Sequence, residues 1–204
     1  MLLTFLKGFG TGGGLIVAIG AQNAFVLSQG VKKNHILLIP LICAVCDGLL
    51  ISLGVTGAGA LIASSKQLTL AAGIGGALFL FVYGFNAFRS AIKGGQMTIN
   101  GETRGLSLKK AVLTTLAVSI LNPHVYIDTM ILLGSIASQF PRPGHLYFGA
   151  GAVLASFVWF FLLSLGGRML APLFSKQISW RILDSLVGLV MWSIAVSLLF
   201  GLSK

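Results

Sequence analysis

The chain has 204 residues, of which 56% are hydrophobic and only 9% are charged, and its mean hydropathy is +0.96. A soluble domain is about one quarter charged, so this composition excludes a soluble enzyme, a disordered tail and a disulfide scaffold. The apolar runs are continuous, whereas the strands of a membrane barrel alternate apolar and polar residues over about ten positions. The formal charge of +10 comes from 14 basic residues scattered between the apolar runs, which indicates contact with anionic lipid rather than with nucleic acid.

Six apolar runs are long enough to cross a hydrocarbon layer roughly 30 Å thick. They predict transmembrane helices at Leu3–Leu27, Ile36–Ala63, Leu68–Phe88, Ala111–Ser138, Leu146–Leu173 and Ile182–Leu202. The first run follows no basic region and has no small-x-small cleavage site, so we expect a membrane helix rather than a signal peptide. The predicted fold class is therefore an all-α polytopic membrane protein, with one transmembrane domain over residues 1–204.

The link Ala91–Lys110 is the only long one, and its Gly94-Gly95, Asn100-Gly101 and Glu102 indicate a polar, flexible loop. Ten basic residues fall in the first, third and fifth links, and four fall in the N-terminus, the even links and the C-terminus. Because cytoplasmic loops carry an excess of Lys and Arg, the odd links are predicted to be cytoplasmic and both termini to lie outside.

Only four residues are acidic, and two of them lie deep inside apolar runs. Asp47 is about 16 Å into the second run and Asp128 about 15 Å from the far end of the fourth, at the rise of an α-helix. A carboxylate at that depth costs about 2.5–3.5 kcal/mol on translocon-type scales, and no Lys or Arg lies deep enough to pair with either. We expect the two carboxylates to bind a cation that is not part of the protein. The alternative is that both are protonated and hydrogen-bonded to Asn23, Asn122 or His124.

The fourth run contains Asn122-Pro123-His124 at its middle. Proline inside a helix removes a backbone hydrogen bond and clashes with the preceding turn, so this helix is predicted to break near Asn122. Broken backbone at membrane depth is tolerated only where it is buried in protein or lines a wet cavity. Pro123 therefore marks a predicted site that faces the interior of the protein.

A short internal match links the two halves of the chain: Asn23-Ala24-Phe25-Val26 is similar to His124-Val125-Tyr126-Ile127. It indicates two three-helix repeats, at about residues 1–90 and 111–204, joined by the loop 91–110. With an odd number of spans in each half, the repeats must be inverted across the membrane. Inverted repeats with interrupted helices at mid-depth are a transporter layout.

Carboxylates, amides and an aromatic ring in one pocket suit a basic amino acid. A carboxylate pairs with an ammonium or guanidinium group, and the ring of Tyr126, with Phe25 as a second candidate, can add a cation–π interaction. The helix N-terminus at the Pro123 break can receive the substrate α-carboxylate. Because burial favours the neutral form of a carboxyl group, Asp47 and Asp128 can each hold either a proton or the cation. That exclusion is a physical basis for proton/substrate antiport.

Cys43 and Cys46 lie one helical turn apart beside Asp47. Such a pair can bind a soft metal or cycle between redox states. No second Cys/His cluster at ligand spacing accompanies it, so we favour two small residues that pack between helices. We expect no resident metal and no cofactor.

Four motifs resemble the LysE/ArgO family of bacterial inner-membrane exporters of lysine and arginine, over essentially the whole chain. They are Gly20–Leu27, Cys46–Ile51, Leu121–Thr129 and Ala155–Phe161. The resemblance implies a six-helix unit that can dimerise and that exports L-arginine or L-lysine in exchange for protons. The predicted substrate-binding residues are Asp47, Asp128, Asn23, Gln22, Asn122, His124 and Tyr126, with Asp47 and Asp128 also coupling protons.

Two positions depart from the family pattern. The family usually has proline where Ala21 stands, so the sequence does not decide whether the first helix breaks there. Asp184 is not part of the family motif, and we expect it to lie at the interface and to pair with Arg181, one turn away. An exposed pair of that kind contributes only a few tenths of a kcal/mol.

Three other functions are considered. Exporters of neutral or hydroxylated amino acids have a PGPN-like motif on the first span and usually NPK on the fourth. This chain has Gly20–Asn23 at the first motif and His124 in place of the lysine of the second, which argues against this function. A divalent-metal exporter would use Cys43, Cys46, Asp47, His124 and Asp128. An intramembrane hydrolase would use His124 and Asp128 as a His–carboxylate pair, but the sequence has no nucleophile motif beside them and no HExxH, so we do not expect an enzyme.

Overall fold

The computed structural model describes residues 1–17, 20–57, 66–93, 106–174 and 176–202. Within these ranges every regular element is a helix and there is no strand, which confirms the all-α class for the described chain. The elements are α1 (Leu2–Ile16), α2 (Ala21–Val31), α3 (Leu38–Val55), α5 (Lys66–Lys93), α6 (Leu108–Ile120), α7 (Pro123–Tyr126), the π-helix η1 (Ile127–Leu132), α8 (Leu133–Ala137), α9 (Gly144–Leu170), the 3-10 helix η2 (Ala171–Phe174) and α10 (Gln177–Leu202).

Four helical segments in the described ranges are long and apolar enough to cross a membrane: α3, α5, α9 with η2, and α10. The bent pair of α1 and α2 makes a fifth if it is counted as one span. The fourth predicted span, Ala111–Ser138, is divided among α6, α7, η1 and α8, each too short to be counted alone. Residues 58–63 of the second predicted span and 94–105 of the long loop lie outside the described residues.

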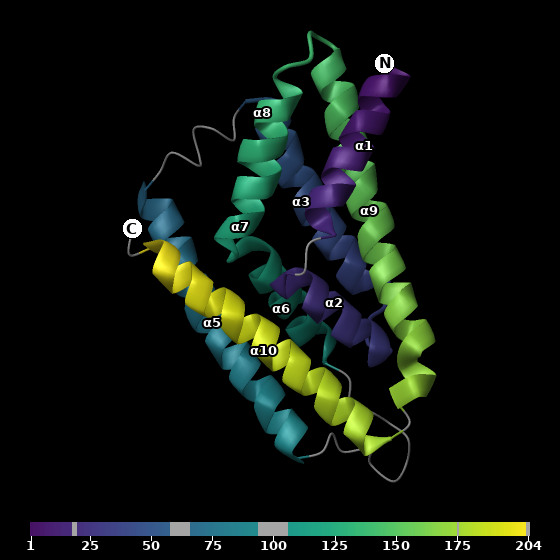
Figure 1. Cartoon of the computed structure of the whole chain (residues 1–204), viewed down its shortest axis with the longest axis vertical. Coiled ribbons are helices and arrows are strands. Elements are labelled where there is room, and N and C mark those ends of the chain that lie inside the picture. Colours follow the sequence, from purple (N-terminus) through teal and green to yellow (C-terminus); the bar gives the residue numbers. More distant parts are fainter. Residues whose placement is uncertain (18–19, 58–65, 94–105, 175, 203–204) are drawn as a thin grey trace.

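The helices pack in two groups that are joined by two shorter ones (Figure 1). α5 and α10 lie side by side, and α9 packs against α1 and α3. α2 contacts both α9 and α10, while α6 contacts both α3 and α5. The largest cluster of buried hydrophobic side chains is built on this junction and includes residues of α2, α3, α5, α6, α9 and α10. The polar cavity described below lies in the same region.

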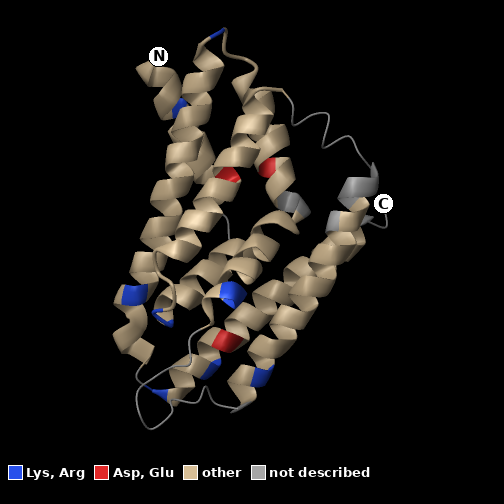
Figure 2. Cartoon of the chain, turned by 180° about the vertical axis from the view of Figure 1, so that it is seen from behind, with Lys and Arg blue, Asp and Glu red and all other residues tan. Residues whose placement is uncertain are grey.

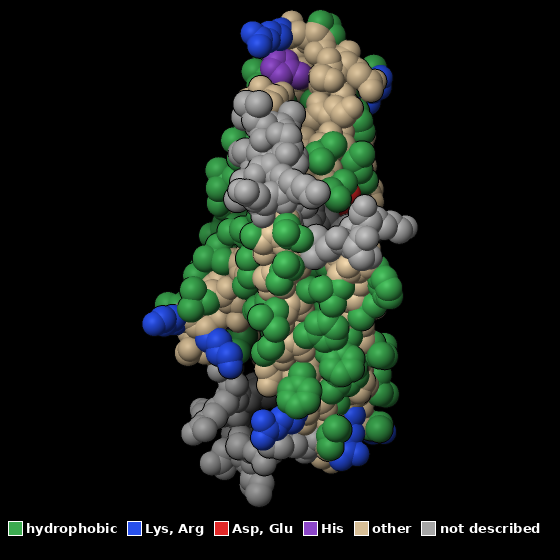
Figure 3. Space-filling view, turned by 90° about the vertical axis from the view of Figure 1, so that its left-hand side faces the viewer, with side chains coloured by type: hydrophobic (Ala, Val, Ile, Leu, Met, Phe, Trp, Pro, Cys, Tyr) green, Lys and Arg blue, Asp and Glu red, His purple; other side chains and the backbone are tan. Residues whose placement is uncertain are grey.

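The surface has the chemistry of a protein surrounded by lipid. Large apolar side chains are exposed on the long helices; Leu49 of α3, Leu78 of α5 and Leu162 of α9 are each more than 60% exposed. Figure 3 shows hydrophobic side chains over much of one face, with basic side chains towards its upper and lower ends. A soluble protein of this size would not leave so much contiguous apolar surface in water.

The first predicted span is not one continuous helix. α1 ends at Ile16 and α2 begins at Ala21, and the two helix axes differ by 82°. Gly20 adopts an extended conformation before α2, with φ −130° and ψ 174°. The side-chain amide of Asn23 donates to the carbonyl of Ile16 at 2.7 Å, which satisfies a group that the end of a helix leaves open. The break in the first helix, which the sequence left open, is therefore present in the structure, and Ala21 does not prevent it.

The break predicted near Asn122 is confirmed. α6 ends at Ile120, residues 121–122 are not helical, and Pro123 is the first residue of α7. Proline suits this position because the first residue of a helix needs no intrahelical N–H bond. The hydroxyl of Tyr126 donates to the carbonyl of Ile120 at 2.6 Å, so it bridges the break and satisfies an open carbonyl of α6.

Two glycines allow the broken helix to approach α3 closely. A Cβ atom on Gly54 would lie 2.7 Å from the Cα of Met130, and one on Gly134 would lie 2.6 Å from the carbonyl oxygen of Gly54. Real Cβ atoms essentially never come so near to backbone, so neither position accepts a side chain without movement of the helices. Small residues at such crossings are the usual means of tight helix packing in membranes.

Gly54→Ala is expected to lower the free energy of unfolding by about 1–3 kcal/mol, the usual cost of overpacking. The matched control is Gly14→Ala on α1, where an added Cβ has no neighbour within 4 Å and alanine is the better helix former. Thermal unfolding of the purified variants in detergent measures both effects. Equal midpoints for Gly54→Ala and the unchanged protein would contradict the close approach.

Candidate functional site

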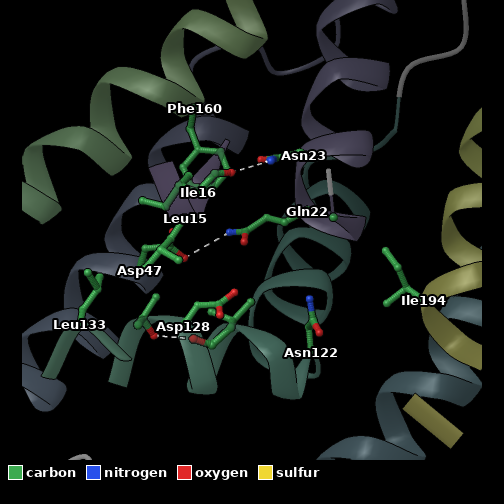
Figure 4. Close-up of a pocket in the computed structure, with 13 residues that line it drawn as sticks. Leu15, Ile16, Gln22, Asn23, Asp47, Asn122, Asp128, Leu133, Phe160 and Ile194 are labelled. Carbon is green, nitrogen blue, oxygen red and sulfur yellow. Dashed lines mark hydrogen bonds between the residues drawn. The ribbon is translucent and has the colours of Figure 1, made fainter. Parts of the chain in front are cut away.

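A cavity of about 310 Å³ lies where the two helix breaks meet. The ends of α1, α2, α7 and η1 surround it, together with parts of α3, α8, α9 and α10. Figure 4 shows polar side chains from α2, α3 and the second break extending into one space. The lining residues are Leu15, Ile16, Gly20, Gln22, Asn23, Asp47, Asn122, Val125, Asp128, Thr129, Leu133, Phe160 and Ile194.

Asp47 of α3 is 2% exposed and is held by two side chains. The hydroxyl of Ser156 on α9 donates to Oδ2 at 2.8 Å, and the side-chain amide of Gln22 donates to Oδ1 at the longer distance of 3.5 Å. The amide of Gln22 also contacts the hydroxyl of Ser119 at 3.1 Å. The buried carboxyl group of Asp47 therefore has hydrogen-bond donors on both oxygens, as buried polar groups in proteins usually do.

Asp128 lines the same cavity from the first turn of the π-helix η1. Single π-turns within helices are rare, and those that occur are frequently at functional sites. Asp128 is half-buried, and Figure 4 shows it extending towards the space below Gln22, as Asp47 does. Among the described residues that line the cavity there is no lysine and no arginine. The structure thus brings onto one cavity the two carboxylates that the sequence places deep in apolar runs.

The amide residues of the predicted site lie at the two breaks. Asn23 lines the cavity, donates to Ile16 and accepts a hydrogen bond from the indole N–H of Trp159 at 3.2 Å. Asn122 is buried and lines the cavity at the non-helical turn before Pro123. Asn23 therefore stabilises the first break, and both amides are placed to meet a ligand.

Two aromatic candidates do not line the cavity. The ring of Phe25 is fully buried and packs edge-on against Tyr83, with 5.8 Å between ring centroids. Tyr126 bonds to Ile120 across the break and is not among the lining residues. Among the described residues that line the cavity, the aromatic ring is that of Phe160 on α9. The side chain of His124 lies outside the part of the chain that the structure describes in detail, although its backbone is part of α7.

Sequence reasoning missed the hydroxyl residues of the site, which are Ser119, Ser156 and Thr129. Ser119 and Ser156 are fully buried within apolar runs, and Ser156 lies in one of the four family-like motifs. The sequence offered a signal for Ser156 in that motif, but a serine in an apolar helix usually bonds to its own backbone. Its contact with Asp47, 109 residues away, could not be inferred from spacing.

The predicted partner of Asp184 was wrong. Its side chain is 4% exposed and forms an ion pair of 2.7 Å with Lys32 at the end of α2. Ser90 of α5 donates to its second oxygen at 2.6 Å. Arg181, the expected partner, is exposed. α10 turns Asp184 towards α2 and α5, so a partner distant in sequence replaces the one in the adjacent turn.

Cys43 is buried and Cys46 half-buried, and both are free thiols. The hydroxyl of Ser119 contacts the sulfur of Cys43 at 3.8 Å. Over the described side chains, no three His, Cys, Asp or Glu residues lie together as a group that could hold a metal ion. The metal-exporter alternative therefore has no ligand set among those side chains.

A profile of the LysE type translocators matches residues 14–201. The chain belongs to the LysE family. Among its relatives, YggA of Aeromonas salmonicida is 43% identical over 98% of both chains. Proteins named arginine exporter protein ArgO are 41% identical in Serratia proteamaculans, over 97% of both chains, and 40% identical in Salmonella typhimurium, over 97% of this chain and 94% of the relative. No solved structure matches this member of the LysE family.

Proposed function

We propose that this LysE family protein exports basic amino acids, L-arginine and/or L-lysine, across the bacterial inner membrane. The observation that carries the proposal is the cavity with Asp47 and Asp128 in its lining and no lysine or arginine among its described lining residues. A cationic side chain from outside the protein supplies the opposite charge. Relatives that carry the name arginine exporter cover nearly the whole chain, which supports the same substrate class.

The cavity offers a partner for each end of such a substrate. Asp47 and Asp128 bind the guanidinium or ammonium group through charge-assisted hydrogen bonds, which are about twice as strong as neutral ones. Phe160 can place its ring against the same cation. The substrate α-carboxylate lies at the breaks, where Gly20 precedes the N-terminus of α2 and Asn122 precedes α7, because the N-terminal end of a helix favours anions. Gln22 and Asn23 contact the substrate between its cationic group and its α-carboxylate.

His124 and Tyr126 have different places in this proposal. His124 stays a proposed binding residue at the start of α7. Tyr126 acts indirectly, because its hydroxyl bond to Ile120 holds the break open.

We propose that transport is coupled to protons through the two carboxylates. A carboxyl group away from water is neutral unless a cation compensates its charge. Binding of arginine therefore displaces a proton from Asp47 or Asp128, and release of arginine on the far side restores it. One site that holds either a proton or the amino acid, but not both, produces exchange of one for the other.

We also propose the six-span layout with two inverted repeats. In each half a broken helix, α1–α2 or α6–α8, precedes two long helices. The packing supports a pseudo-two-fold relation, since α3 pairs with α9, α5 with α10, and each broken helix packs on the long helix of the other half. The described basic residues gather towards the end of the molecule where α2 and α9 end and α10 begins (Figure 2). That end is proposed to be cytoplasmic, with both termini towards the outside.

The proposal is tested in a bacterium that lacks exporters of basic amino acids. Cells that express this protein and are fed arginine- or lysine-containing dipeptides are expected to release the free amino acid, while cells with an empty vector accumulate it. Threonine- and homoserine-containing peptides, fed in parallel, distinguish export of basic amino acids from export of neutral or hydroxylated ones. Release of threonine or homoserine without arginine or lysine would refute the proposed substrate class.

A further inference from the structure

The carboxylate of Asp47 is held from one side by a residue outside the cavity lining. Ser156 of α9 is fully buried, and its hydroxyl donates to Asp47 Oδ2 at 2.8 Å. Ser156 is not among the residues that line the cavity, whereas Asp47 and Gln22 are. The hydroxyl therefore reaches a ligand in the cavity only through the carboxyl group that it contacts.

The two oxygens of Asp47 have unequal partners. Oδ2 receives the short bond from Ser156. Among the described residues, Oδ1 has the 3.5 Å contact from Gln22, a length at which a hydrogen bond is weak. Since Gln22 is itself a lining residue, Oδ1 is the oxygen on the cavity side. A cation that enters the cavity meets Oδ1 while Ser156 keeps Oδ2 in place.

Ser156 does not make the bond to its own helix that two other hydroxyl residues near the site make. Thr115 and Thr129 donate to the carbonyls of Ala111 and Val125, four residues back on their own helices, each at 2.6 Å. This local bond is the usual choice of Ser and Thr in a membrane helix. Ser156 instead bonds to a carboxyl group on another helix, as Ser90 does to Asp184, but the carboxyl group that Ser156 holds is one that lines the cavity.

A hydroxyl also suits both states of a carboxyl group that exchanges a proton for a cation. It can donate to the ionised carboxylate and, after turning about its C–O bond, accept from the protonated acid, because it carries one donor and two acceptor lone pairs. An ammonium or guanidinium donor in its place could serve only the ionised state. The bond between Ser156 and Asp47 can therefore persist through the whole proposed cycle.

We propose that Ser156 is a positioning residue that fixes Asp47 Oδ2 against α9, so that Oδ1 stays directed at the substrate cation in both protonation states. This inference rests on the proposed function. It adds a residue on α9, outside the cavity lining, that controls substrate affinity through another side chain.

The test measures arginine transport into proteoliposomes by purified Ser156→Ala, Ser156→Thr and Ser164→Ala proteins. Ser156→Ala is expected to raise KM about tenfold or more, the effect of losing one hydrogen bond to a charged group, with a much smaller change in kcat. Ser156→Thr restores KM, because threonine retains the hydroxyl. Ser164→Ala is the matched control: Ser164 is two turns along the same helix, is equally buried, and donates to the carbonyl of Ile36 at 2.8 Å.

A second measurement separates positioning from general stability. The infrared band of Asp47, identified by its loss in Asp47→Asn, is expected to shift in Ser156→Ala and to keep its position in Ser164→Ala. If Ser156→Ala does not insert, Ser156→Cys serves instead, since a thiol of similar shape is a much weaker donor. Unchanged KM and an unchanged band in Ser156→Ala, with Asp47→Asn inactive, would overturn the inference and leave the proposed function intact. Full activity of Asp47→Asn would instead overturn the proposed function.

Discussion

Asp47→Asn and Asp128→Asn are each expected to abolish arginine export while the protein remains in the membrane. Removing one partner of a buried charge pair costs about 2–5 kcal/mol of binding free energy, and each 1.4 kcal/mol is about tenfold in affinity. Efflux of arginine from dipeptide-fed cells, with the amount of protein in the membrane measured in parallel, checks the expectation. Glu102→Gln is the control for loss of an acidic charge, because Glu102 lies outside the apolar runs, and it should export normally.

The same Asp47→Asn variant is expected to be as stable as the unchanged protein, or more stable. Asparagine has nearly the shape of aspartate and can still accept the hydrogen bond from Ser156, and it removes the cost of a charge away from water. A residue kept for function often lowers stability in this way. If Asp47 were instead a structural residue, its replacement would lower the unfolding midpoint. A lower midpoint together with normal export by the inserted fraction would contradict the role of Asp47 as a substrate carboxylate.

The features that could be predicted from the sequence are those determined by local chemistry. An apolar run long enough to cross the bilayer does so whatever its neighbours are. The ends of α5, α9 and α10 lie within five residues of their predictions, and α3 begins two residues after its predicted start but ends at Val55, before the predicted Ala63. Proline at 123 excludes a helical bond wherever it stands, so the second break was predictable. Asp47 and Asp128 were conspicuous because a carboxylate deep in a membrane helix is costly and rare.

The features that could not be predicted depend on contacts between distant segments. The break before α2 has no proline; it combines an extended Gly20 with the bond from Asn23 to Ile16 and the indole of Trp159. Nothing in the sequence around Asn23 distinguishes that arrangement from a continuous helix. The π-turn that carries Asp128 likewise has no sequence signature. Close packing of α3 against the broken helix requires glycine at 54, but several described glycines, such as Gly14 and Gly166, have no neighbour within 4 Å of an added Cβ.

Replacing Lys32 by methionine is expected to lower the free energy of unfolding by about 3 kcal/mol, the lower end of the cost of breaking a buried ion pair. The ammonium of Lys32 lies 2.7 Å from Asp184 Oδ1, and the side chain of Asp184 is only 4% exposed. Methionine fills the space of the lysine stem but supplies no charge, so Asp184 must either stay ionised without its cation or take up a proton. Thermal unfolding in detergent measures the loss, and Lys33→Met, at the exposed next position, is expected to have little effect.

Replacing the two members of this ion pair should change the stability unequally, because the side chain of Lys32 is 30% exposed and that of Asp184 only 4%. Asp184→Asn leaves a lysine that can extend its ammonium to water, so it is expected to cost less than Lys32→Met. The double variant Lys32→Met, Asp184→Leu should recover most of the stability, since apolar pairs often replace buried ion pairs without loss. Equal losses in all three variants would show that packing of α2 against α10, rather than the charge pair, holds the α5–α10 helices to the part of the molecule that carries the cavity.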